Sequence, residues 1–247
     1  HDTNIIKEVQ KITSFNQVNW NKQDDLIHYI EEGFDAIYLE KVKELSLAKE
    51  AIQAQKSMPI VFSPIHGASG KMVPAALKAF GFENIQVVKE QAEPDGNFPT
   101  VIYPNPEEPE ALTLAVALGK KSGAALVLAC DPDGDRYAAV VPNEAGEYEL
   151  LNGNQTGTLL VYYLLSRKQE LGLLTGKDFM VNTIVTTELI NKIAEGFGIP
   201  CYNVLTGFKN IASIILQKEG KEKFLAGGEE SFGFLVGDFV RDKDGVS

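Results

Sequence analysis

Three aspartates at alternate positions follow the most apolar run of this sequence. Asp131, Asp133 and Asp135 come directly after Ala124–Cys130, and Arg136 stands beside the last of them. An apolar run of this kind is typical of a strand that is covered on both faces. Ligands of open α/β sheets gather at the carboxyl ends of the strands, and the acidic loop is expected to lie there.

Three carboxylates in one loop predict a cation site. Two like charges about 4 Å apart repel by about 1 kcal/mol in water and about 4 kcal/mol at an effective dielectric constant of 20. Oxygen ligands without His or Cys indicate Mg²⁺ rather than Zn²⁺. Three protein oxygens leave open positions on an octahedral ion for a phosphate oxygen and water. The guanidinium of Arg136 is suited to binding an oxyanion beside that ion.

Two known metal loops and a plain acidic turn compete with this interpretation. An EF-hand requires Gly where Arg136 stands and Glu where Pro142 stands, so that interpretation fails. The signature of the haloacid-dehalogenase phosphatases matches Asp131–Gly134 but requires Thr where Asp135 stands, while Gly237–Asp242 mimics a later motif of that family. An aspartyl-phosphate phosphatase therefore stays open as an alternative, as does a solvated turn at the end of a strand.

The overall composition excludes several classes of protein. The 247 residues hold 23 Lys and Arg against 34 Asp and Glu, a formal charge of −11 that argues against binding nucleic acid or an anionic membrane surface. The apolar run Ala124–Cys130 is far shorter than the roughly 20 residues of a membrane-spanning helix. Cys130 and Cys201 lie in apolar surroundings and indicate no disulfide framework. A cytoplasmic protein is expected, and the first residue, His1, suggests a piece of a longer chain.

Helical and strand-like patterns alternate along the chain, which predicts parallel sheets with helices on both faces. We expect an α/β fold with two consecutive domains, each a mixed, mostly parallel sheet. The domains are placed at residues 33–148, which carry the acidic loop, and 149–247, with residues 1–32 as the tail of a preceding domain. The expected helices are 34–56, 70–80, 110–122, 155–167, 188–197 and 208–218, and the expected strands are 59–62, 85–88, 124–130, 137–141, 148–151, 179–185, 201–205 and 224–226.

Several short motifs occur in the order known from one family. Asp131–Arg136 resembles the metal loop, and Gly228–Gly233 the sugar-recognition loop, of the α-D-phosphohexomutases, the phosphoglucomutase/phosphomannomutase family. Further matches are Ser63–Gly67, Glu93–Pro99, Pro104–Glu107, Thr206–Lys209 and Arg241–Gly245. The sequences Gly153–Gly157 and Ile184–Thr187 are most similar to those of the bacterial branch related to phosphoglucomutase and phosphopentomutase.

The resemblance implies a four-domain enzyme of which this chain is the second and third domains. The phosphoserine loop belongs to the first domain and a phosphate-binding loop to the fourth, so this chain is expected to hold no nucleophile and to be inactive alone. The implied activity is a magnesium-dependent isomerase reaction that interconverts sugar 1-phosphate and 6-phosphate. It passes through a bisphosphorylated intermediate, with glucose 1,6-bisphosphate as activator, and a small phosphosugar is the expected partner.

The resemblance also implies roles for individual residues. Asp131, Asp133 and Asp135 are expected to bind Mg²⁺. The expected substrate-binding residues are Arg136, Thr206, Glu229, Ser231 and Lys243. Lys209 is either an exposed lysine at the start of a helix or a phosphate contact. Phosphopentomutase activity within the same family and a sugar-phosphate-binding module without activity remain alternatives.

Overall fold

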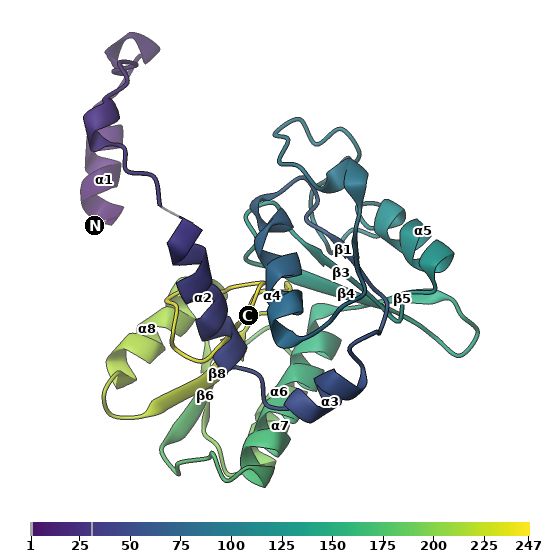
Figure 1. Cartoon of the computed structure of the whole chain (residues 1–247). Helices are drawn as coiled ribbons and strands as arrows, with labels where there is room; N and C mark the ends of the chain where they lie inside the picture. Colours follow the sequence, from purple (N-terminus) through teal and green to yellow (C-terminus); the bar gives the residue numbers. More distant parts are fainter. Residues whose placement is uncertain (1, 31) are drawn as a thin grey trace. The chain divides into compact units, whose positions relative to one another are not determined.

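The computed structural model describes residues 2–30 and 32–247 and divides into two compact units. The first unit ends at Phe34 and contains α1 (Asp2–Val9) and two short 3-10 turns, η1 (Phe15–Gln17) and η2 (Asp24–Leu26), drawn in purple in Figure 1. The predicted tail, residues 1–32, falls here, and its His1 and Glu31 lie outside the described residues. The second unit, Asp35–Ser247, contains both sheets.

The first sheet has the strand order β2-β1-β3-β4-β5. Its strands are β1 (Ile60–Ser63), β2 (Ile85–Val87), β3 (Leu126–Cys130), β4 (Tyr137–Pro142) and β5 (Tyr148–Leu151). β1 pairs in parallel with β2 and β3, whereas β4 is antiparallel to β3 and β5. The fully apolar β3 is therefore central, and the acidic loop follows its carboxyl end.

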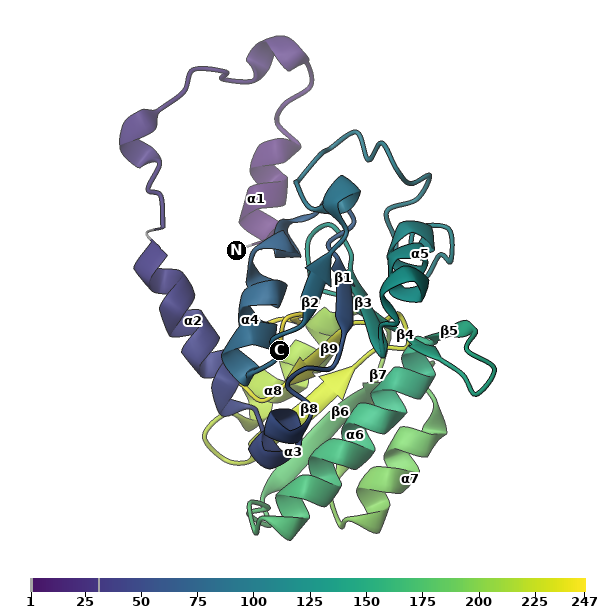
Figure 2. The same ribbon diagram turned by 45° about the vertical axis from the view of Figure 1, so that its right-hand side comes forward.

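Helices cover both faces of this sheet because alternate strand residues point to opposite sides. Val61 and Val127 pack in the cluster that includes Ala115 of α5 (Thr113–Ser122). Phe62 packs with Val73 of α4 (Met72–Phe80) on the other side. Figure 2 shows α4 and α5 on opposite sides of the strands.

The second sheet has the order β7-β6-β8-β9, with the first three strands parallel and β9 antiparallel. Its strands are β6 (Asp178–Thr183), β7 (Cys201–Val204), β8 (Lys223–Gly228) and β9 (Phe234–Val236). One face packs against α6 (Gly153–Glu170) and α7 (Glu188–Gly196). The opposite face packs against α8 (Phe208–Lys218). The predicted α/β fold with two mixed sheets is thus confirmed.

Two differences from the sequence-based expectation concern the existence of an element, whereas the other expected elements differ only in their bounds. The helix expected over residues 34–56 is two helices, α2 (Glu32–Glu44) and α3 (Lys49–Ala54). β9 was not expected at all, and this three-residue strand is defined by its antiparallel pairing with β8. Every helix within residues 2–30 and 32–247 is too short or too polar to cross a membrane.

Candidate metal centre and its neighbouring loops

The acidic loop brings its three aspartates together at the carboxyl end of β3. Asp131, Asp133 and Asp135 each place a carboxylate oxygen within 4.8 Å of the others. The turn is closed by the N–H of Gly134, which donates to the main-chain oxygen of Asp131 at 3.0 Å. Asp131 is 1% exposed, whereas Asp133 is exposed, so the group runs from the interior to the surface.

Arg136 binds Asp131, the buried member of this group. Its main-chain N–H donates to Asp131 Oδ1 at 3.0 Å and its Nε donates to Asp131 Oδ2 at 2.6 Å. Nη1 donates to Asn105 Oδ1 at 3.3 Å and lies 3.5 Å from Glu107 Oε1. Burial alone lowers the pKa of the Arg136 guanidinium, but the hydrogen bond to Asp131 and the surrounding carboxylates outweigh this and raise it. Arg136 is therefore a fixed, permanently charged group.

The electrostatics and the donor set both fit a hard divalent cation. Partial desolvation and the charge of Asp131 raise the pKa of the Asp133 carboxyl, so the site tolerates a further negative charge poorly on its own. Each carboxylate oxygen has two lone pairs, and those of Asp131 therefore keep acceptor capacity beyond the bonds from Arg136. The group consists of aspartates, whose oxygens suit Mg²⁺.

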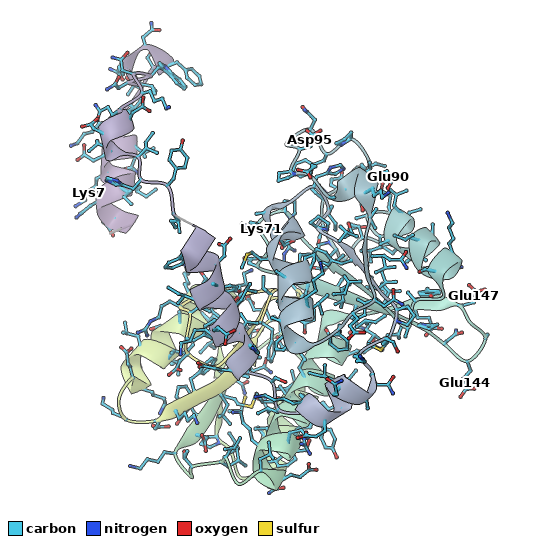
Figure 3. All side chains as sticks on the ribbon, viewed as in Figure 1. Lys7, Lys71, Glu90, Asp95, Glu144 and Glu147 are labelled. Atoms are coloured by element: carbon cyan, nitrogen blue, oxygen red, sulfur yellow. The ribbon has the colours of Figure 1, made fainter. Side chains whose placement is uncertain are left out.

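The loop after β1 packs closely against the acidic loop. A Cβ atom on Gly67 would lie 2.4 Å from Pro132 Cα, and the N–H of Ala68 donates to the main-chain oxygen of Pro132 at 2.8 Å. His66 of this loop is buried, and its Nε2 lies 2.8 Å from Thr100 Oγ1. His66 is thus bonded within the connection between β2 and α5, on which Figure 3 labels Asp95.

The turn between β8 and β9 presents Glu229. Its main-chain N–H donates to the oxygen of Gly233 at 2.8 Å, which closes the turn. Glu229 is 7% exposed, and its Oε1 accepts from the main-chain N–H of Gly207 at 2.8 Å. Thr206, which precedes Gly207 in the sequence, is exposed and lies near Glu229 because of this bond. Ser231, on the same turn as Glu229, is partly exposed. Lys209, on α8, is exposed.

Glu230, the neighbour of Glu229, holds this turn through hydrogen bonds to two threonines. Its Oε2 accepts from Thr186 Oγ1 at 3.0 Å and from Thr183 Oγ1 at 3.4 Å. Its main-chain oxygen lies so close to Gly153, the first residue of α6, that a Cβ there would be 1.9 Å away. Sequence reasoning assigned no role to this residue, although the Ile184–Thr187 motif contains Thr186.

Main-chain contacts join the acidic loop to the turn. Arg136 forms an antiparallel bridge with Gly233, and the N–H of Tyr137 donates to the oxygen of Phe232 at 3.2 Å. From the C-terminal segment, Lys243 Nζ lies 3.1 Å from Asp135 Oδ2. Arg136 and Lys243 thus lie at the acidic group, while Glu229 and Ser231 lie on the turn bonded to it and Thr206 is linked through Glu229.

Comparisons with known proteins agree with this arrangement. Residues 36–146 match the family description "Phosphoglucomutase/phosphomannomutase, alpha/beta/alpha domain II", and residues 152–247 match "Phosphoglucomutase/phosphomannomutase, alpha/beta/alpha domain III". The chain is 37% identical over 221 residues to a phosphomannomutase of Mycoplasmoides pirum, covering 90% of this chain and 40% of that protein. It is 35% identical over 222 residues to a phosphoglucomutase of Staphylococcus saprophyticus, covering 89% and 39%.

A solved structure shares the fold. The putative phosphomannomutase from Thermus thermophilus matches with a TM-score of 0.67 at 24% identity, over 86% of this chain and 44% of that one. The chain spans about two fifths of the length of the curated relatives named above, which are therefore considerably longer proteins.

Proposed function

Because the chain belongs to the phosphoglucomutase/phosphomannomutase family and contains its second and third α/β/α domains, we propose that it is the metal-binding and sugar-recognising part of a magnesium-dependent phosphosugar mutase. The proposed reaction is an isomerisation between sugar 1-phosphate and sugar 6-phosphate. It passes through a bisphosphate such as glucose 1,6-bisphosphate and a phosphoserine that lies outside this chain. Glucose phosphates are the proposed substrates, with mannose or pentose phosphates as the alternatives within the family.

The observation that carries this proposal is the juxtaposition of two loops. Three carboxylates within 4.8 Å of one another lie on a loop whose Arg136 is bridged, main chain to main chain, to Gly233 of the Glu229 turn. A cation site and a turn rich in hydrogen-bonding groups therefore belong to one local structure. A phosphorylated sugar offers an anion and several hydroxyls, which are the groups that such a pair of loops can recognise together.

The proposed role of the acidic loop is to hold the cation. Asp131, Asp133 and Asp135 would bind Mg²⁺, which when bound neutralises charge on a phosphoryl group during transfer. Arg136, fixed by Asp131, would orient an oxyanion of the substrate, and Lys243 would add a point charge for a phosphate.

The proposed role of the turn is to read the sugar. Glu229 Oε1 already accepts from Gly207, so Oε2 is the proposed acceptor for a sugar hydroxyl. The hydroxyl of Ser231, two residues further on, would donate to or accept from an adjacent sugar hydroxyl, and Thr206 would lie beside the bound sugar.

The geometry of Asp131 favours this role over that of a phosphatase nucleophile. In a haloacid-dehalogenase-like enzyme the first aspartate of the motif would attack phosphorus and must present a free oxygen. Asp131 is 1% exposed, and both of its oxygens accept from Arg136.

We also propose a domain layout for this part of the mutase. Residues 1–32 would end the preceding domain, which supplies the phosphoserine, and residues 33–148 and 149–247 would be the two α/β domains. A fourth domain would complete the phosphate site. Because the nucleophile lies elsewhere, we propose that the 247-residue chain does not turn over sugar phosphates alone.

Thermal unfolding with and without Mg²⁺ tests the metal site. A cation that binds only the folded state raises stability by RT ln(1 + [L]/Kd), and each kcal/mol gained shifts the midpoint by about 2–4 °C in a chain of this size. We expect Mg²⁺ to raise the midpoint of the wild-type chain and to leave that of Asp133→Ala unchanged. Asp238→Ala, at an exposed position outside the acidic loop, is the control and should keep the shift. An equal shift in Asp133→Ala would contradict the assignment.

A further inference from the structure

Lys243 reaches from the C-terminal segment across to the acidic loop. Its Nζ lies 3.1 Å from Asp135 Oδ2, and its side chain is 19% exposed. The aliphatic part runs over Gly233, where a Cβ would lie 2.7 Å from Lys243 Cδ. The side chain is thus confined between the acidic loop and the Glu229 turn, and its charge is directed at one of the three clustered carboxylates.

Main-chain hydrogen bonds fix the backbone directly after Lys243. The N–H of Gly245 donates to the oxygen of Gly134 at 3.0 Å, and the N–H of Asp244 donates to the oxygen of Phe234 at 3.1 Å. The Asp244 carboxylate accepts from the hydroxyl of Tyr38 at 2.5 Å and from the N–H of Val246 at 3.0 Å. A change at Asp135 is therefore accommodated by the Lys243 side chain rather than by movement of its backbone.

An ammonium group and a divalent cation make opposing demands on Asp135. Both cations are attracted to the Asp135 carboxylate, and two cations held at one carboxylate repel each other strongly at partly buried positions. The Lys243 side chain lies against Gly233 of the Glu229 turn, so an ammonium released from Asp135 stays next to this turn. The same side chain can then pair with an anion.

We propose that Lys243 couples cation binding to phosphate binding by competing with the divalent cation for Asp135. A cation bound by the three aspartates displaces the ammonium from Asp135, and the freed ammonium pairs with the phosphate of a sugar phosphate. Each ligand therefore tightens the binding of the other, and linkage requires the two effects to be equal. This inference rests on the proposed function, which assigns the three aspartates to the metal.

Calorimetric titration of the 247-residue chain with Mg²⁺ alone, and again with glucose 1-phosphate present, tests the coupling. Removing the competing charge in Lys243→Met should tighten Mg²⁺ binding by roughly three- to tenfold. Glucose 1-phosphate should tighten Mg²⁺ binding to the wild type by a similar factor. The effect should be clearly smaller in Lys243→Met, where only the direct attraction between the cation and the phosphate remains. Lys243→Arg keeps the charge and should behave like the wild type. Lys120→Met removes an exposed lysine that pairs with Glu147 at the same 3.1 Å, and should change nothing.

A measurement on the wild-type chain avoids reliance on variants that fold poorly. Acetylation of lysine amines, followed by mass spectrometry, should label Lys243 at least twice as fast when Mg²⁺ is present, because the amine is released from Asp135. Lys120 should show no change.

The outcomes separate the two proposals. If the wild type binds Mg²⁺ and Asp133→Ala does not, but Lys243→Met binds Mg²⁺ no more tightly than the wild type, the coupling is wrong and the metal site stands. An Mg²⁺-independent labelling rate at Lys243 has the same meaning. If the wild type and Asp133→Ala respond to Mg²⁺ alike, the metal site is wrong and the coupling is wrong with it.

Discussion

Two aspartates of one loop have opposite electrostatic surroundings. Asp131 is buried and accepts two hydrogen bonds from Arg136, so its charge lies beside a positive partner. Asp133 lies on the same loop, and partial desolvation and the negative charge of Asp131 raise the pKa of its carboxyl. A group whose pKa is raised by folding contributes stability below its unfolded pKa, and this contribution is lost as the pH rises through its folded pKa. At neutral pH without a cation, the charge of Asp133 therefore opposes folding.

Neutral substitutions at these two positions should consequently change stability in opposite directions. Asp131→Asn leaves Arg136 without its charged partner and should lower the free energy of unfolding by about 1–3 kcal/mol. Asp133→Asn removes the charge that opposes folding and should raise the free energy of unfolding. Urea denaturation at pH 7 in the presence of EDTA measures both, and repetition at pH 4 should shrink the gain from Asp133→Asn, because protonation of the Asp133 carboxyl removes part of the opposing charge. A loss of stability in Asp133→Asn at pH 7 would contradict this account.

At the level of elements, close main-chain contacts position the two loops. Gly153, capped by Asn152 at the start of α6, lets that helix approach the main chain of Glu230. The helix start and the turn therefore share a contact that has no room for a side chain.

Gly153→Ala should lower the free energy of unfolding by about 2 kcal/mol or more, because its Cβ would lie 1.9 Å from a main-chain oxygen that cannot rotate away. Gly196→Ala, at the end of α7 with open space around its Cβ, is the matched control. It should raise stability by up to about 1 kcal/mol through helix propensity. Equal effects of the two substitutions in urea denaturation would show that the contact at Gly153 is not tight.

The sequence was informative wherever a local pattern determined the structure. The apolar run before Asp131 predicted a covered strand, and the alternating carboxylates predicted a cluster that lies at its carboxyl end. Contacts between distant residues had no such signal: Arg136 bonds Asn105 over 31 positions, and Thr186 bonds Glu230 over 44. Short polar side chains that pair across the fold leave no periodic trace, so the roles of Asn105, Thr186 and Glu230 needed the structure.

At the scale of the whole molecule, the two sheets belong to one compact unit, Asp35–Ser247. Tyr137 joins the two sheets in two ways. Its main chain bonds Phe232, and its ring packs against the core clusters of both sheets. The sheets therefore share buried apolar surface as well as main-chain hydrogen bonds.

Unfolding of this unit should accordingly be cooperative. We expect differential scanning calorimetry to give one transition for both sheets, with a calorimetric enthalpy equal to the van't Hoff enthalpy. Tyr137→Ala removes the shared ring and should lower the midpoint, because a large aromatic side chain is lost from both clusters. Two separate transitions in the wild-type chain would instead indicate sheets that are stable independently.

The bridge between Arg136 and Gly233 also limits how these loops can change in length. Successive residues of paired extended chains point to opposite sides, so inserting or deleting one residue between Cys130 and Arg136 would offset the pairing and turn the guanidinium away from Asp131. Changes in loop length that preserve this pairing must therefore come in compensating pairs or fall elsewhere, such as the exposed hairpin tip at Glu144–Gly146.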